Sequence, residues 1–197
     1  MMDGECLCVL IRRSAAVLLI LGYAGCANAP GAGGHFGRAG TKANVFVTPA
    51  HENVQRVAVL PFKAATELIG ASVSDMFVTE LLRTHRYELI ERSQLANILG
   101  EAEIALSGLT TGQAAQVGKM AGADAVIIGT VSEYENVAQW GYALPVVGIS
   151  VRMIDSESGR IIWSVDHAER GERRSTLAQH SRAVVHEMTA ALYRQIR

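Results

Sequence analysis

The chain has 197 residues, of which 49% are hydrophobic and 19% are charged, and its formal net charge is −1. This length suits one domain, and the apolar content argues against wholesale disorder. A net charge near zero is not typical of a nucleic-acid-binding protein or of a protein with a polybasic membrane patch. All three cysteines, Cys6, Cys8 and Cys26, precede the folded part, which excludes a disulfide framework and a cysteine-ligated metal there.

The first element in chain order is a targeting signal. Two arginines at 12–13 precede a short apolar segment, residues 14–21, whereas a membrane-spanning helix needs ~20 apolar residues. The sequence GYAGC at 22–26 then places two small residues before Cys26. This pattern resembles a bacterial lipobox, in which the chain is cut before the cysteine and the thiolate takes a lipid. Tyr23 departs from the motif, which usually has an aliphatic residue there.

On this interpretation, residues 1–25 are a lipoprotein signal peptide and Cys26 is lipidated. Two alternatives stay open: an ordinary cleaved signal that leaves a free thiol, and a segment retained as an anchor. Ala27 follows the cysteine where an Asp would favour the inner membrane, so the lipobox resemblance implies the outer membrane. Acyl chains contribute ~0.8 kcal/mol for each buried CH₂, and a multiply acylated cysteine therefore anchors stably. We expect the chain at the periplasmic face of the outer membrane.

Residues 26–52 are expected to form the lipidated N-terminus and a flexible linker. The segment 27–44 is rich in Gly and Ala and has no apolar period, which is typical of a flexible linker. Its glycine cluster does not indicate a phosphate-binding loop, because such a loop follows a strand and opens a helix.

The first half of the folded domain, residues 53–197, combines strand and helix signals. Residues 54–62 alternate in polarity and are rich in β-branched side chains, which predicts a strand. The spacing of apolar residues predicts a helix over 69–84. Similar signals predict a strand over 87–91, a helix capped by Ser93 and running through 94–103, a helix from the Thr110–Gln113 capping box to Gly122, and a buried strand over 123–135.

The second half predicts two antiparallel strands, 144–154 and 160–170, joined by a turn at 155–159. On each strand apolar residues alternate: Val147, Ile149, Val151 and Met153 on the first, and Ile161, Trp163 and Val165 on the second. The tail, 175–197, is an amphipathic helix with the stripe Leu177, Val184, Met188, Leu192 and Ile196. The order of elements predicts an α/β (α+β) single domain with a mixed β-sheet of about five strands packed by helices.

No residue pattern indicates a catalytic, cofactor-binding or metal site, and we expect the protein not to be an enzyme. The segment 112–120, GQAAQVGKM, lacks the Walker glycine spacing and the Ser or Thr that holds magnesium. Metal-binding helices place ligands three or four residues apart, whereas His180 and His186 are six apart. The remaining groups favour structural or solvated roles: His167 with Asp166 and Glu169, and the diverging pair Glu101 and Glu103.

Five segments occur in an order that is similar to the curli production assembly/transport lipoprotein family (CsgG-like). They are VAVLPF, SDMFVTELL, YELIERSQLANILGE, LTTGQAAQVGKMAGADAVIIGTVSEYE and VRMIDSESGRIIWS, between residues 54 and 164. The resemblance implies an outer-membrane lipoprotein with a periplasmic α/β domain. In the type member of the family, two β-hairpins grow out of that domain and join on oligomerisation into a secretion channel.

The chain departs from this pattern at both hairpins. Only NVAQWGYA, residues 136–143, separates two predicted strands, and the last helix follows soon after 165–174. A short ribbon with Trp140 and Tyr142 as interface aromatics fits this length, but spanning strands of ~9–11 residues do not. The chain thus resembles a short form of the family.

The expected function is an outer-membrane-anchored assembly or interaction module in envelope secretion or curli-type export. Its partners would be the outer membrane, through the lipid on Cys26, envelope or secretion proteins, and copies of itself. Two alternatives remain, an oligomeric outer-membrane secretion channel component and a lipoprotein regulator of peptidoglycan synthases.

Overall fold

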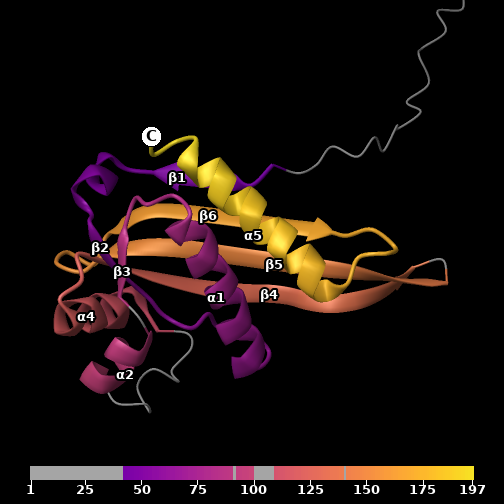
Figure 1. Ribbon diagram of the computed structural model, residues 1–197, viewed down its shortest axis with the longest axis horizontal. Coiled ribbons are helices and arrows are strands. Elements are labelled where there is room, and N and C mark those ends of the chain that lie inside the picture. Colours follow the sequence, from indigo (N-terminus) through magenta and orange to yellow (C-terminus); the bar gives the residue numbers. More distant parts are fainter. Residues whose placement is uncertain (1–41, 91, 100–108, 140) are drawn as a thin grey trace, which may run out of the picture. The chain divides into compact units, whose positions relative to one another are not determined.

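A six-stranded sheet in the order β1–β6–β5–β4–β2–β3 organises the fold (Figure 1). The structure, a computed structural model, describes residues 42–90, 92–99, 109–139 and 141–197. The strands are β1 (Asn44–Val47), β2 (Arg56–Val59), β3 (Glu88–Ile90), β4 (Ala125–Gln139), β5 (Tyr142–Asp155) and β6 (Ile161–Arg170). The helices are η1 (Pro49–Asn53, a 3₁₀ helix), α1 (Glu67–Leu82), α2 (Arg92–Leu99), α4 (Thr111–Ala121) and α5 (Leu177–Tyr193).

The sheet is mixed, as the sequence predicts. β2 runs parallel to β3 and to β4, whereas β4, β5, β6 and β1 pair with their neighbours in antiparallel fashion. Successive residues of a strand point to opposite faces of the sheet, so alternating residues of β4 face two different helix layers. Ile127 belongs to the core beneath α1 and α5, and Ile128 to the core beneath α2 and α4.

The larger core lies under α1 and α5, which lie side by side over the sheet (Figure 1). Its centre is aromatic: the rings of Phe62 and Phe77 lie 5.8 Å apart, and those of Phe77 and Trp163 lie 6.4 Å apart. The predicted apolar residues of the strands, except Ile161, and those of the tail helix enter this core, with Val184, Met188 and Leu192 fully buried. Trp163 is fully buried too, which confirms its interpretation as a structural anchor.

The helix ends confirm the local signals with one exception. Thr110 and Gln113 form the predicted capping box, and Gly122 ends α4 with a left-handed φ of 62°. Ser93 is not an N-cap, because α2 begins one residue earlier at Arg92. The rest of the predicted helix through 94–103 lies outside the described residues after Leu99.

Two features of the sheet differ from the sequence-based expectation. β1 lies inside the segment 26–52 that was expected to be linker, so the sheet has one strand more than predicted. Ile161 does not share the buried face of Trp163, since a register shift at Met153/Ile154 leaves it 37% exposed and buries Ile162 instead. The signal peptide and Cys26 lie outside the described residues.

Candidate functional site

The histidines considered as ligands have separate structural partners. His180 is buried, and its Nε2 donates to the backbone oxygen of Glu169 at 2.8 Å. His167 is also buried, with Nε2 3.7 Å from Oε2 of Glu169. Asp166 lies on the opposite side of β6, where its carboxylate accepts a hydrogen bond from Asn44 at 3.0 Å. The structure therefore brings His167 and Glu169 together but not Asp166.

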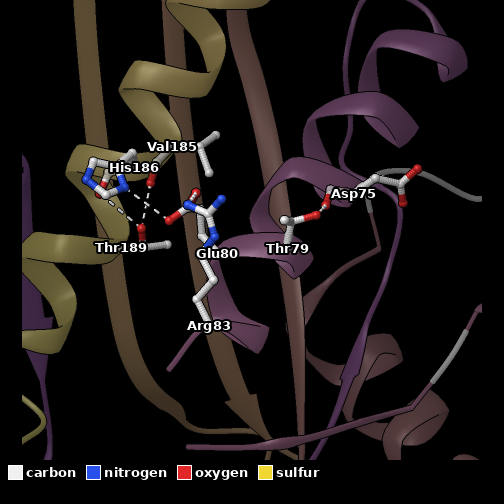
Figure 2. Close-up of polar contacts among 7 residues, drawn as sticks. All are labelled: Asp75, Thr79, Glu80, Arg83, Val185, His186 and Thr189. Atoms are coloured by element: carbon white, nitrogen blue, oxygen red, sulfur yellow. Dashed lines mark hydrogen bonds and ion pairs between the residues drawn. The ribbon is translucent and has the colours of Figure 1, made fainter. Parts of the chain in front are cut away.

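A polar cluster that the sequence did not indicate joins α1 to α5 (Figure 2). Glu80 on α1 is 8% exposed, and its Oε1 accepts a hydrogen bond from Arg83 at 2.9 Å. Its Oε2 lies 3.0 Å from Nδ1 of His186 on α5. On the same turn of α5, the hydroxyl of Thr189 donates to the backbone oxygens of Val185 and His186, at 2.9 and 3.0 Å.

This cluster is suited to holding two helices together. Both carboxylate oxygens of Glu80 are engaged, and the side chains of Arg83 and His186 are 66% and 64% exposed. The spacing of Glu80 and Arg83 on one helix is visible in the sequence, whereas the His186 contact joins residues 106 positions apart.

Two depressions flank the cluster along the helices. The first, of about 710 Å³, is lined by α1 residues from Leu68 to Arg83 and by Arg182 of α5. The second, of about 520 Å³, lies toward the ends of both helices and includes Tyr193. Burial raises the pKa of Tyr193 to about 12, and its hydroxyl oxygen lies 2.6 Å from that of Thr84. Leu68 is 80% exposed at the first depression, so this helix pair offers an accessible apolar side chain.

The most distinctive exposed feature is the tip of the β4–β5 hairpin. The two strands stay paired until Gln139 and Tyr142, beyond the ends predicted near 135 and 144. β6 ends at Arg170 opposite Val146, so residues 136–139 and 142–145 form a two-stranded ribbon that projects from the sheet (Figure 1). The predicted short ribbon is thus present, and Trp140 lies outside the described residues.

Arginines at the end of β6 and in the loop after it contact this ribbon. The guanidinium carbon of Arg173 lies 3.7 Å from the ring centroid of Tyr142, a cation–π contact. Arg170 donates to the side-chain oxygen of Gln139 at 2.5 Å. Tyr142 is 48% exposed and Val137 38%, and the sequence 136–146 contains no charged residue. The ribbon therefore has an uncharged, partly apolar tip, whereas its base carries both arginines and the carboxylates of Glu135 and Glu169.

Two further properties hold for the part of the chain that the structure describes. None of its helices is both long enough and apolar enough to cross a membrane. None of its groups of His, Cys, Asp and Glu has three members placed to hold a metal ion.

Three solved structures are similar to this chain. The PelC dodecamer from Paraburkholderia phytofirmans is 19% identical over 76% of this chain and 95% of that chain, with a TM-score of 0.55. Lipoprotein GNA1162 from Neisseria meningitidis is 20% identical over 69% of this chain and 99% of that one, with a TM-score of 0.49. The LpoB C-terminal domain from Salmonella enterica is 17% identical over 58% of this chain and 82% of that one, with a TM-score of 0.46.

No curated protein matches the chain. The family model described as "Curli production assembly/transport component CsgG" matches residues 42–180. This range includes all six strands of the sheet and begins just before β1. The match spans more than half of the chain, and the chain therefore belongs to the CsgG family.

Proposed function

We propose that this protein is a lipoprotein, anchored through Cys26 to the periplasmic face of the outer membrane, whose CsgG-like domain serves as an assembly or interaction module in envelope secretion or curli-type export. The family membership over residues 42–180 supports the theme of export. The lipobox-like sequence before Cys26 supports the anchor. On this proposal the domain works by contact with the membrane and with other proteins.

The projecting ribbon is the observation that carries the proposal. Aromatic side chains with a polar edge favour the membrane–water interface, and arginines favour the level of the lipid phosphates. Tyr142 and Arg173 supply these two groups in contact at the ribbon. The ribbon beyond the sheet spans only residues 136–145, which is short of the ~9–11 residues that each crossing strand needs. We therefore propose that the tip rests on the bilayer surface.

The register of the sheet supports the same orientation. β1 begins at Asn44, which pairs with Asp166, and Asp166 in turn pairs with Ser150 of β5. β1 thus starts about midway along β5, and its first residue is the one nearest the ribbon. From Ser150 to the tip, the strand advances by roughly 25 Å at ~3.3 Å per residue.

The linker that the sequence predicts would match that span. If residues 27–43 behave as a flexible chain, their root-mean-square span would be roughly 20–25 Å. A lipid on Cys26 and the ribbon tip can therefore meet the same bilayer surface without strain. This geometry would also hold the domain in one orientation, because two separate points would contact the membrane.

Self-assembly is the second part of the proposal. The PelC structure, which shares this fold with a TM-score of 0.55, is described as a dodecamer. We propose that copies of this chain likewise assemble on the membrane, with the lipid anchors on one side. Native mass spectrometry of the protein extracted in detergent measures the number of subunits, and a purely monomeric spectrum would contradict this part.

Two measurements test the membrane contacts. Cys26→Ser should be released from membranes or remain unprocessed in envelope fractionation, and unchanged retention would remove the lipid anchor from the proposal. In the unlipidated Cys26→Ser background, flotation with vesicles containing phosphatidylglycerol should depend on Tyr142. Tyr142→Ser should lower the floated fraction, whereas Phe46→Ser, which changes a 56% exposed aromatic on β1, should not. Equal effects of the two changes would reject the ribbon as the contact.

The channel alternative has its own measurement. Purified wild-type protein in planar bilayers should show no conductance if the ribbon contacts the surface without crossing it. Reproducible single-channel currents that disappear in a variant lacking residues 136–145 would replace the present proposal by the channel.

A further inference from the structure

The face of the sheet opposite α1 and α5 carries polar side chains next to the exposed Phe46. A row of paired residues crosses this face: Lys63 bridges to Thr130, Thr130 pairs with Ser150, Ser150 with Asp166, and Asp166 with Asn44. Paired residues point to the same side of a sheet. This row therefore places two short hydroxyl side chains between a lysine on one side and the pair Asp166 and Asn44 on the other.

A cavity of about 180 Å³ opens at the lysine end of the row. Lys63, Thr130 and Arg152 supply its polar side chains, and Leu60, Leu109 and Ile128 are among its apolar ones. Leu60 and Ile128 are buried at 5% and 9% exposure, so the apolar wall belongs to the core beneath α2 and α4. Arg152 pairs with Ile128 across β4 and β5, which fixes its backbone beside the cavity.

The two cations in this cavity lack a counter-charge within the described chain. Neither the ammonium group of Lys63 nor the guanidinium of Arg152 has a hydrogen bond or ion pair with another described residue, and no Asp or Glu lines the cavity. The carboxylate on the same face, Asp166, already accepts from Asn44. By contrast, both depressions along α1 and α5 contain Glu80 beside their arginines.

We propose that this cavity binds a small oxyanion, a phosphate or carboxylate group, between Lys63 and Arg152. Two like charges that share one hollow repel each other, and an anion between them turns the repulsion into two charge-assisted hydrogen bonds. Arg152 supplies a planar fork for two oxygens, Lys63 a point charge, and the Thr130 hydroxyl a further donor. The apolar wall lowers the local dielectric and strengthens both contacts. This site is independent of the lipid anchor and the ribbon.

Isothermal titration calorimetry on the full-length protein in a non-ionic detergent tests the site. The probes are sodium phosphate and sodium acetate, with sodium chloride at matched ionic strength as the reference. We expect saturable binding of phosphate, acetate or both, and the preferred probe identifies the source as a phosphate or a carboxylate group. Lys63→Gln and Arg152→Gln should each weaken binding, which raises the dissociation constant about tenfold.

The matched control is Arg160→Gln, which removes the same charge from an arginine in the β5–β6 turn that does not line the cavity. It should leave the dissociation constant unchanged. Saturation by neither probe, identical heats with chloride, or equal weakening by Arg160→Gln would overturn the site. Lys63 is exposed, so Lys63→Gln should keep the thermal unfolding temperature of the wild type and tests the site without disturbing the fold.

Discussion

The same substitution in two helices should have opposite effects on stability. Gly70 in α1 and Gly112 in α4 both have backbone angles that alanine adopts without strain. A Cβ at Gly112 would meet no atom within 4 Å, whereas a Cβ at Gly70 would overlap the carbonyl oxygen of Phe62 and lie 3.0 Å from its carbonyl carbon. Gly112→Ala therefore measures the conformational benefit of alanine alone, whereas Gly70→Ala also measures how closely α1 packs on the chain that follows β2.

The free energies of unfolding of the two variants should change in opposite directions. Replacing glycine by alanine at a compatible position stabilises a protein by about 0.4–1 kcal/mol. Gly112→Ala should show this gain, near its lower end because the residue lies in the first turn. At Gly70 the obstacle is backbone, and α1 cannot move away without disturbing the fully buried Val73 and Phe77. Overpacking costs about 1–3 kcal/mol, so Gly70→Ala should have a net cost of about 2 kcal/mol.

Thermal unfolding followed by circular dichroism measures both changes. For a domain of this size, 1 kcal/mol shifts Tm by about 2–4 °C, so Gly70→Ala should lower Tm by about 4–8 °C. Gly112→Ala should raise it by about 1–2 °C. A Gly70→Ala protein as stable as the wild type would refute the close approach of α1 to Phe62, and a destabilised Gly112→Ala protein would refute the open surroundings of the start of α4.

Three further predictions concern caps, helix contacts and pH. Thr110→Ala removes the α4 capping box and should cost about 1 kcal/mol in urea unfolding, with no loss if the cap is not formed. Glu80→Ala removes the contact with His186 between α1 and α5 and the contact with Arg83 at the end of α1; since both partners are mostly exposed and regain water, the free energy of unfolding should fall by only about 1–2 kcal/mol. Burial raises the pKa of Tyr193 from 10.0 to about 12, so its contribution to stability is complete below pH 10 and is lost as the pH rises toward 12. Tyr193→Phe should flatten the pH dependence of the unfolding midpoint across that range, and an unchanged slope would contradict the burial.

Features that depend on neighbours in sequence were predictable. The capping box at Thr110 and the stop at Gly122 are local arrangements of backbone and side chain, and both are present as predicted. The buried stripe of α5 follows from helical spacing alone. The family resemblance, carried by segments between 54 and 164, is confirmed by the family match over 42–180.

Features that depend on pairing across the sheet were not predictable. β1 has four residues, too few to establish a period, and it is a strand because Val45 and Val47 pair with Val165 and Trp163 of β6. The fate of Ile161 depends on a register shift against β5. The contact of Glu80 with His186 needs two helices packed on one core, which no local pattern encodes.

The residues proposed to contact the membrane are exposed and do not belong to the buried core of the fold. The two core clusters draw on every strand except the ribbon beyond residue 135, where Val137 and Tyr142 stay exposed. Changes at the ribbon therefore remove little buried apolar area and should leave the free energy of unfolding nearly unchanged. If a ribbon variant loses membrane contact but keeps the wild-type Tm, the loss results from the changed surface of the ribbon and not from unfolding of the domain. The same reasoning applies to Lys63 on the face opposite α1 and α5, because its exposed ammonium group contributes to neither core.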